Sequence, residues 1–334
     1  MGSKALFLRV RVGLVLVAAA LAAGGCGSGG GSLGTAPEGT TSSGDPLAFH
    51  TGQALFTVAG RAFIEPEVTS RQAESGVHIR NATARVVRLR GNGQVVEAAQ
   101  GRLDADGSYS IPVPAAAGNA GRGEVWAVEV LGLAVSEIIT DIRLWAAFVP
   151  GSEGLTLRRD VSAASTLVAA GLLNAATIPP MTQGDVDRLE EHAAAHARNG
   201  VDLLSLRPGA EERLTGQTVA AFNSAVDRIE LLAGGEAASA ANSASLTMRV
   251  GEEATLSARA IGDGAPLAIP LEFAVTGTGD PVTLTQTGPA TAALSAVRTG
   301  SATVVVRIAV PGNTEAPRKS ATLAVTVVNS AGAL

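Results

Sequence analysis

The stretch that decides the fold is LDADGSYSI, residues 103–111, in which a turn leads directly into an alternating strand. Residues 104–107 are of the types that favour a tight turn, and residues 108–111 alternate polar and apolar side chains. The same period of two extends over residues 54–149, and Gly91-Asn92-Gly93 marks a hairpin within it. Short strands separated by turns about every ten residues predict an antiparallel β-sandwich, with residues 104–107 as its second hairpin.

Three parts of this region resemble the carboxypeptidase regulatory-like domain, a transthyretin-like sandwich. They are Val58-Ala59-Gly60, residues 77–86 with Asn81-Ala82-Thr83 at their centre, and residues 103–111 followed by Pro112-Val113-Pro114. In this family the module is not catalytic, and it braces or presents neighbouring parts or binds on a surface. The resemblance therefore implies a non-catalytic sandwich, to which we assign residues 49–150.

The N-terminus has the features of an export signal. Lys4, Arg9 and Arg11 form a basic region, and residues 12–23 are an unbroken run of small and apolar side chains. That run is shorter than the ~20 residues that a membrane-spanning helix needs. We therefore expect residues 1–25 to be a signal peptide.

Cys26 is the only cysteine of the chain and follows the signal directly. Residues 21–26 resemble the lipobox of bacterial lipoproteins, although Ala23 stands where leucine is usual. The resemblance implies a lipid anchor on Cys26, and Gly27 after it implies release to the outer membrane where a cell has two. The alternative is ordinary cleavage that leaves Cys26 as a free thiol. Residues 26–48, poor in apolar side chains, predict a flexible tether behind the anchor.

The period of the sequence changes after Pro150, and residues 151–235 predict a helical segment. Asp160 is the expected N-cap of a first helix, and Thr182 with Asp185 is a variant of the capping box for a second. Residues 160–169 are similar to the segment that often follows this sandwich module in secreted bacterial proteins. The three expected helices cover residues 161–173, 182–199 and 216–233.

Strand patterning returns after a linker at residues 236–244. The expected strands lie at residues 246–250, 254–260, 271–275, 291–297, 302–308 and 321–328. Residues 246–252, 270–275, 300–306 and 324–328 resemble a bacterial immunoglobulin-like domain of group 2, with Phe273 in place of the usual core tryptophan. Such domains extend, present or adhere, which implies a second non-catalytic sandwich at residues 245–329. The expected fold is mainly β with a helical insert: two antiparallel β-sandwiches separated by a three-helix segment.

His192 and His196 are the candidate metal ligands with the most specific spacing. Their i, i+4 separation would place both on one helix face, as zinc ligands require, with Asp185 as a conceivable third ligand. The glutamate that follows the first histidine in zinc proteases is absent. We favour the alternative, a solvated helix flank, because both histidines lie beside the apolar stripe.

Asp104, Asp106 and Ser108 place oxygen atoms at alternate positions, as a calcium loop does. An EF-hand needs glycine at its sixth position and a bidentate acid at its twelfth, whereas Gly107 is fourth here and Ala115 is twelfth. We therefore favour a turn between two strands over a calcium site.

The composition argues against several classes of function. The chain has 25 basic and 30 acidic residues, and loss of the basic signal would make it more acidic, so we expect no nucleic-acid partner. Four histidines occur, without a phosphate loop, serine elbow or histidine–glutamate zinc motif, so we expect no enzyme and no cofactor.

Aromatic residues, on which sugar-binding surfaces commonly rely, make up 3% of the chain. Trp126 and Trp145 lie in apolar runs that suit the core better than a sugar-binding surface.

These observations favour an exported lipoprotein anchored in the outer membrane or at the cell surface. The expected role is non-catalytic binding or adhesion through the sandwich modules, with an envelope protein or a glycan as partner. A structural spacer or scaffold within an envelope assembly is the alternative, and a polysaccharide-binding accessory protein is a third interpretation. The sequence leaves the ligand-binding residues unassigned.

Overall fold

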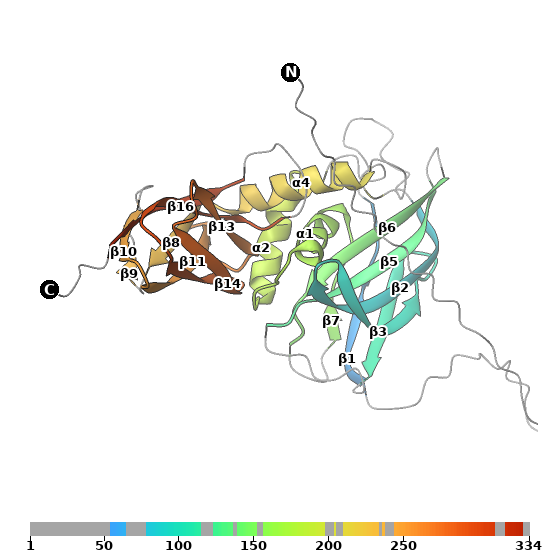
Figure 1. Cartoon of the computed structure of the whole chain (residues 1–334). Helices are drawn as coiled ribbons and strands as arrows, with labels where there is room; N and C mark the ends of the chain where they lie inside the picture. The colour runs from blue at the N-terminus through green and yellow to red at the C-terminus, as the bar shows by residue number, and fades with distance from the viewer. Residues whose placement is uncertain are drawn as a thin grey trace, which may run out of the picture. The chain divides into compact units, whose positions relative to one another are not determined.

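The computed structural model describes residues 54–64, 78–114, 123–135, 139–151, 156–197, 204, 210–233, 236–237, 244–310 and 318–329. In these residues strands dominate, and three helices, α1, α2 and α4, separate two sets of strands along the chain (Figure 1). The expected fold class is therefore confirmed. None of the helices in this part of the chain is long and apolar enough to cross a bilayer.

The first set of strands forms two sheets, with the orders β4-β1-β7 and β3-β2-β5-β6. Phe56 packs edge-on against Trp126 and Phe148, with ring centroids 5.4 and 6.3 Å apart. Trp126 and Trp145 are buried, as predicted. The two sheets form the first sandwich, and the strands are β1, Ala54–Arg61, β2, His78–Gly91, β3, Gln94–Arg102, β4, Ser108–Pro114, β5, Trp126–Val135, β6, Ile139–Phe148, and β7, Thr156–Arg158.

The stretch at residues 103–111 connects the two sheets of this sandwich. Tyr109 and Ile111 of β4 are buried, and Ser110 between them is exposed. The turn before β4 is not a hairpin, so that prediction is wrong: β3 pairs with β2, whereas β4 pairs with β1. Gly107 has φ +81°, and a Cβ there would lie 2.8 Å from the Ala62 carbonyl oxygen, so this corner requires glycine.

The helices are α1, Ala163–Asn174, α2, Gln183–Ala194, and α4, Ala210–Ala225. The capping box of Thr182 and Asp185 is confirmed at α2. The sequence predicted Asp160 as the N-cap of α1, but the structure has Ser162 in this position. The Asp160 carboxylate instead accepts a 2.9 Å hydrogen bond from the backbone N–H of Arg61, which ties the start of the helical segment to β1.

The third helix ends at Ala225, so the prediction of a helix up to residue 233 is wrong. Residues 228–233 form strand β8 instead. Ile229 and Leu231 are buried, while Arg228 is exposed, which is the alternation of a strand. The apolar residues at 228–233 fit both the period of a helix and the period of a strand. The antiparallel pairing of β8 with β11 selects the strand.

The second set of strands forms a sandwich of the immunoglobulin kind. The order β14-β15-β11-β8 corresponds to strands D, E, B and A, and the order β17-β16-β13 corresponds to G, F and C. Strands β8 and β9 thus belong to this sandwich, although the sequence placed them in a helix and a linker. The strands are β8, Arg228–Ala233, β9, Glu236–Ala237, β10, Ala244–Arg249, β11, Glu253–Gly262, β12, Ala265–Leu267, β13, Leu271–Gly277, β14, Val282–Gly288, β15, Thr291–Ala296, β16, Gly300–Ile308, and β17, Ser320–Val328.

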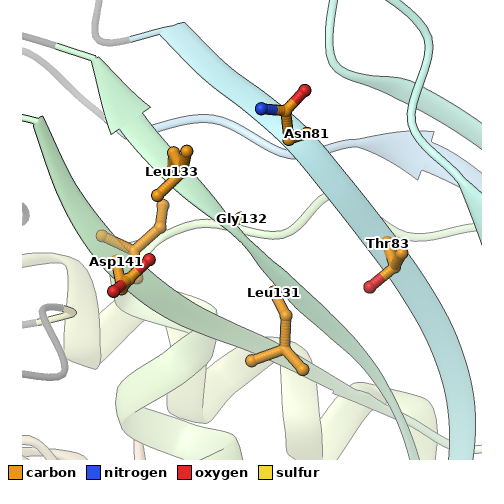
Figure 2. A pocket seen from close by; sticks show the side chains of 7 residues that line it. Asn81, Thr83, Leu131, Gly132, Leu133 and Asp141 are labelled. Carbon is orange, nitrogen blue, oxygen red and sulfur yellow. The ribbon is translucent and has the colours of Figure 1, made fainter.

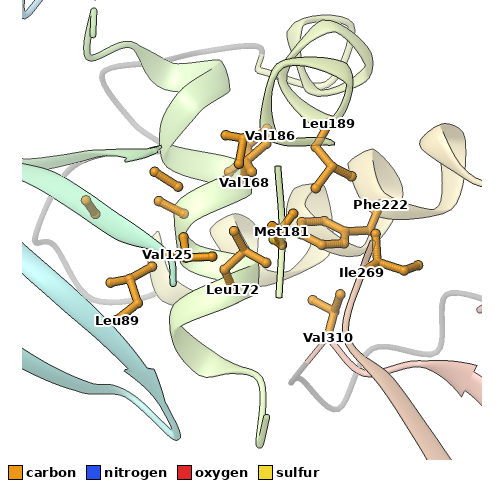
Figure 3. Close-up of a cluster of buried hydrophobic side chains, with 14 of the residues drawn as sticks. Leu89, Val125, Val168, Leu172, Met181, Val186, Leu189, Phe222, Ile269 and Val310 are labelled. Carbon is orange, nitrogen blue, oxygen red and sulfur yellow. The ribbon is translucent and has the colours of Figure 1, made fainter. Parts of the chain in front are cut away.

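Buried apolar side chains continue from the first sandwich through the helices to the second (Figure 3). Leu89 of β2 lies at one end of this cluster, and Val310, which follows β16, lies at the other. Leu172 of α1 and Phe222 of α4 lie between them. The helices therefore fill the space between the sandwiches with a shared apolar core.

Helix α1 also closes the free edge of β6, the last strand of its sheet. The backbone N–H of Trp145 donates a 2.9 Å hydrogen bond to Thr166 Oγ1, and Ser165 Oγ donates one of 2.7 Å to the Trp145 carbonyl. The N–H of Val149 donates to Gln183 Oε1 of α2 at 2.9 Å. These bonds protect an edge that would otherwise be open to another strand. They give the hydroxyl residues of the 160–169 segment a structural role.

Candidate functional site

The residues singled out from the sequence do not converge on one site. Cys26, the expected lipid attachment residue, and the signal and tether at residues 1–48 lie outside the described residues. Among the residues that are described, no group of three or more His, Cys, Asp or Glu side chains is arranged to hold a metal ion.

His192 and His196 are not on one helix face, because α2 ends at Ala194 and His196 lies in the turn that follows. His192 Nε2 lies 3.3 Å from a carboxylate oxygen of Asp263, in the turn between β11 and β12. His192 therefore contributes to the contact between α2 and the second sandwich. The structure does not support a zinc pair on one helix face.

Asp185, the conceivable third metal ligand, is a helix cap. Its carboxylate accepts hydrogen bonds from the Thr182 N–H at 2.9 Å and from the Arg188 guanidinium at 2.7 Å. Burial alone would raise the pKa of Asp185, but these bonds and one from the Ala268 N–H outweigh it and lower the pKa. The carboxylate oxygens are engaged by the protein itself, so they hold the fold at this point.

Asp104 and Asp106 form the turn that we favoured over a calcium loop. Asp106 Oδ1 accepts bonds from the N–H and the hydroxyl of Ser108 at 3.0 and 2.7 Å, and Asp104 Oδ2 lies 3.2 Å from the same hydroxyl oxygen. The bonds from Ser108 lower the pKa of Asp106. One oxygen of each carboxylate thus faces Ser108 within the turn.

A hollow of about 380 Å³ lies on the outer surface of the β3-β2-β5-β6 sheet (Figure 2). Leu131, Gly132 and Leu133 of β5 form its apolar floor, and Figure 2 shows Asn81 and Thr83 on β2 across from Asp141 on β6. Asn81, Thr83 and Asp141 are exposed. We call this part of the sheet the open face, and it comprises Asn81, Thr83, Arg85, Glu97, Leu131, Gly132, Leu133, Asp141 and Arg143, with Glu129 buried beneath the arginines.

A β-bulge in β2 shapes the hollow. The register between β2 and β5 shifts between Arg80 and Thr83, so that Asn81 and Ala82 together face Gly132. Asn81 has φ +51°, a left-handed conformation that asparagine tolerates better than most residues. A bulge bends its strand and re-aims a side chain, and bulges are over-represented next to active sites. The local backbone therefore fixes the position of the Asn81 amide at the rim.

The charges beside the hollow are paired with one another. Glu129 is fully buried, and its carboxylate accepts hydrogen bonds from Arg85 and from Arg143, the latter at 2.6 Å. The bond to Glu129 raises the pKa of Arg85, which also lies 3.3 Å from Glu97. The guanidinium of Arg143 lies 5.3 Å from the ring centre of Trp145, in a cation–π contact. Both arginines are thus held by protein groups.

No residue pattern in the sequence predicted the open face. Glu129 is the one acidic residue within the apolar run at residues 125–130, and a buried carboxylate requires a cationic or hydrogen-bonding partner. An acidic residue within an apolar run was therefore the sequence feature that could have indicated this cluster. Its partners, Arg85 and Arg143, lie 44 and 14 residues away, and only the sheet order brings them together.

No known protein family matches the sequence, and no curated protein matches it. Among solved structures, a chimeric titin Z1Z2 carrying a decorin peptide is 21% identical, and the match covers 26% of this chain and 88% of that one, with a TM-score of 0.17. An endo-fucoidan hydrolase of glycoside hydrolase family 107 is 13% identical, with 77% of this chain and 25% of the hydrolase covered and a TM-score of 0.22. A nucleoside hydrolase-related protein from Saccharophagus degradans is 13% identical, and the match covers 36% of this chain and 30% of that one, with a TM-score of 0.22.

Proposed function

We propose that this protein is a non-catalytic binding protein of the cell envelope, anchored by a lipid on Cys26, which binds its partner on the open face. The observation that carries the proposal is the hollow of about 380 Å³ on that face. Asn81, Thr83 and Asp141 line it, and no side-chain hydrogen bond or ion pair engages these three groups within the described part of the chain. Available polar groups around an apolar floor are typical of a ligand site.

The chemistry of the hollow supports binding rather than catalysis. General acid–base catalysis needs a titratable group positioned within hydrogen-bond reach of the reacting atoms, usually with a second group in a complementary role. Asp141 is the one titratable residue that lines the hollow. Glu129, the nearby buried acid, is occupied by Arg85 and Arg143. A single carboxylate with an amide and a hydroxyl can orient a ligand by hydrogen bonds.

The anchor and the tether complete the proposal on the ground of the sequence. A lipid on Cys26 would hold the chain on the membrane without a spanning helix. Residues 26–48 would separate the folded part from the bilayer by a root-mean-square distance of roughly 25 Å for a flexible chain. The open face would then reach partners near the membrane surface.

A structural spacer is a second candidate function, because specific bonds join the helices to the second sandwich. Arg188 of α2 donates a 2.8 Å hydrogen bond to the Pro266 carbonyl. The Lys319 N–H donates to Asn223 Oδ1 of α4 at 2.9 Å. With the shared apolar core, these bonds support a stiff connection of the kind that a spacer needs.

The binding proposal is tested with the full-length protein and two variants of the same sheet. Leu131→Arg places a long cationic side chain in the hollow, whereas Val96→Arg places one on β3, where Val96 is 51% exposed. We expect the wild type and Val96→Arg to retain the same component of an envelope extract and Leu131→Arg to lose it. Equal retention by all three proteins would refute the open face as the binding surface and favour the spacer.

The anchor is tested separately by cell fractionation. Cys26→Ser should move the protein from the membrane fraction to the soluble exported fraction, because the acyl chains can no longer be attached. A Cys26→Ser protein that stays in the membrane fraction would contradict the lipid anchor without bearing on the open face.

A further inference from the structure

We propose that the hollow of the open face holds one sugar residue of an uncharged polysaccharide; this inference rests on the proposed function and names its ligand class. The hollow has a volume of about 380 Å³ and lies open on the sheet, so a ring seated in it could remain linked to further residues of a chain. The residues that line it combine hydrogen-bonding groups on the rim with an apolar floor. A sugar ring has the same two kinds of surface, because hydroxyl groups surround its apolar C–H face.

The polar groups of the rim match hydroxyl groups in kind. Asn81 offers an amide donor and a carbonyl acceptor, Thr83 offers a hydroxyl that does both, and Asp141 accepts only. Hydroxyl groups of a sugar also donate and accept, so each can find a partner among these three. The apolar floor of Leu131 and Leu133 can pack against C–H groups without leaving a buried polar atom unpaired.

The charges of the open face favour a neutral ligand over an anionic one. Arg85 is bound to Glu97 and Glu129, and Arg143 donates to Glu129 through Nε, so carboxylates of the protein already offset both positive charges. Asp141 at the rim would repel an anion directly. A sugar without charge encounters neither the repulsion nor the need to break an existing ion pair.

The backbone makes Asn81 suitable for a sharp test. Because Asn81 has φ +51°, glycine can replace it with little backbone strain while the amide is removed. Asn92 has φ +52° at the other end of β2, so Asn92→Gly is a control with the same change in the same conformation. Thr83→Val removes one hydroxyl from a strand residue, and Thr326→Val on β17 is its exposed control.

The experiment titrates immobilised full-length protein with the neutral and the acidic polysaccharide fractions of the cell envelope, separated by anion exchange, and with inorganic phosphate. We expect saturable binding of the neutral fraction. Asn81→Gly, Thr83→Val and Asp141→Asn should each weaken that binding about five- to tenfold, as the loss of one hydrogen bond does. Asn92→Gly and Thr326→Val should bind as the wild type does.

Two results would overturn the sugar inference. One is preference for the acidic fraction or phosphate, and the other is neutral binding that Asn81→Gly and Asp141→Asn leave unchanged. Retention of an envelope protein that Leu131→Arg abolishes, without affinity for the neutral fraction, would also overturn it while supporting the open face as a binding surface. If Leu131→Arg changes no retention at all, the proposed function itself fails.

Discussion

Two charged clusters in the described structure each contain a carboxylate removed from solvent, fully at Glu129 and partly at Glu190, but they differ in the number of arginines. On the open face, the single carboxylate of Glu129 accepts hydrogen bonds from two arginines, Arg85 on Oε2 and Arg143 on Oε1. Between the end of β7 and α2, the single guanidinium of Arg159 is shared by Glu190 and by Asp187, the latter at 3.3 Å. The buried acid of the first cluster thus has two cations, with Glu97 as a second, more exposed acid 3.3 Å from Arg85, whereas the second cluster has one cation for two acids.

Glu190 shows the effect of sharing one guanidinium between two carboxylates. Burial raises the pKa of Glu190 to about 7, Arg159 opposes the rise, and the charge of Asp187 adds to it. An acid with this pKa changes charge between mildly acidic and neutral pH. A partly buried carboxylate that shares its one guanidinium with a second acid therefore responds to pH in this range.

The largest expected effect comes from breaking the cluster on the open face. Replacing Arg85 and Arg143 together by alanine leaves Glu129, whose side chain has 0% exposure, without a cationic partner. We expect the free energy of unfolding at pH 7 to fall by about 3–5 kcal/mol, the cost typical of stranding a buried charge. Urea denaturation of both single variants and the double variant measures it, and each single change should cost less than half of the total.

The second sandwich offers a matched control for that experiment. Glu230 also lies between two arginines, with Arg228 at 2.8 Å and Arg259 at 2.5 Å. The Glu230 side chain is 14% exposed, against 0% for Glu129, and its two arginines are 54% and 55% exposed. Replacing Arg228 and Arg259 by alanine should therefore cost about 1 kcal/mol or less, as exposed ion pairs do. Equal losses in the two double variants would show that burial of the carboxylate is not what makes the first cluster important.

The next effect concerns the pH dependence of stability at Glu190. The folded chain keeps a proton on Glu190 up to about pH 7, whereas the ordinary value is 4.5, so this contribution to stability is complete below pH 4.5 and is lost as the pH rises through 7. Between pH 4.5 and 8 the loss should be on the order of 2 kcal/mol. Glu190→Gln should abolish this fall, as measured by urea denaturation across the range.

Glu191→Gln is the control for this measurement, because it removes an exposed carboxylate from the same helix. It should leave the fall in stability between pH 4.5 and 8 in place. A Glu190→Gln protein with the same pH profile as the wild type would contradict the assignment of the fall to Glu190.

Residue patterns predicted the fold where one period dominates, and failed where two periods coexist. The alternation from Ser108 to Ile111 predicted β4 because each inward side chain is buried by the opposite sheet. At residues 228–233, Ile229 and Leu232 fit a helix, while Ile229 and Leu231 fit a strand. Pairing with β11, which no local pattern encodes, selects the strand.

The candidate site was less predictable than the fold, because its parts are far apart in the sequence. Asn81 and Asp141 come from β2 and β6, and the two strands lie on either side of β5. The bulge at Asn81 depends on the register between β2 and β5, which a single sequence does not show. Cys26 is the opposite case, since its prediction rests on a local motif and remains a prediction.

The smallest expected effect comes from changing the ratio of charges at Arg159. Asp187→Asn leaves Arg159 with Glu190 as its remaining ionisable partner, and it removes a negative charge that raises the pKa of Glu190. The pKa of Glu190 should fall by less than about one unit, because the side chain of Asp187 is 58% exposed and its field is screened. A carbon-13 NMR titration of the Glu190 carboxyl group measures this, and the pH midpoint of the stability loss should move in the same direction. A midpoint that stays or rises would show that burial alone sets the pKa of Glu190, and that the ratio of charges does not distinguish the two clusters.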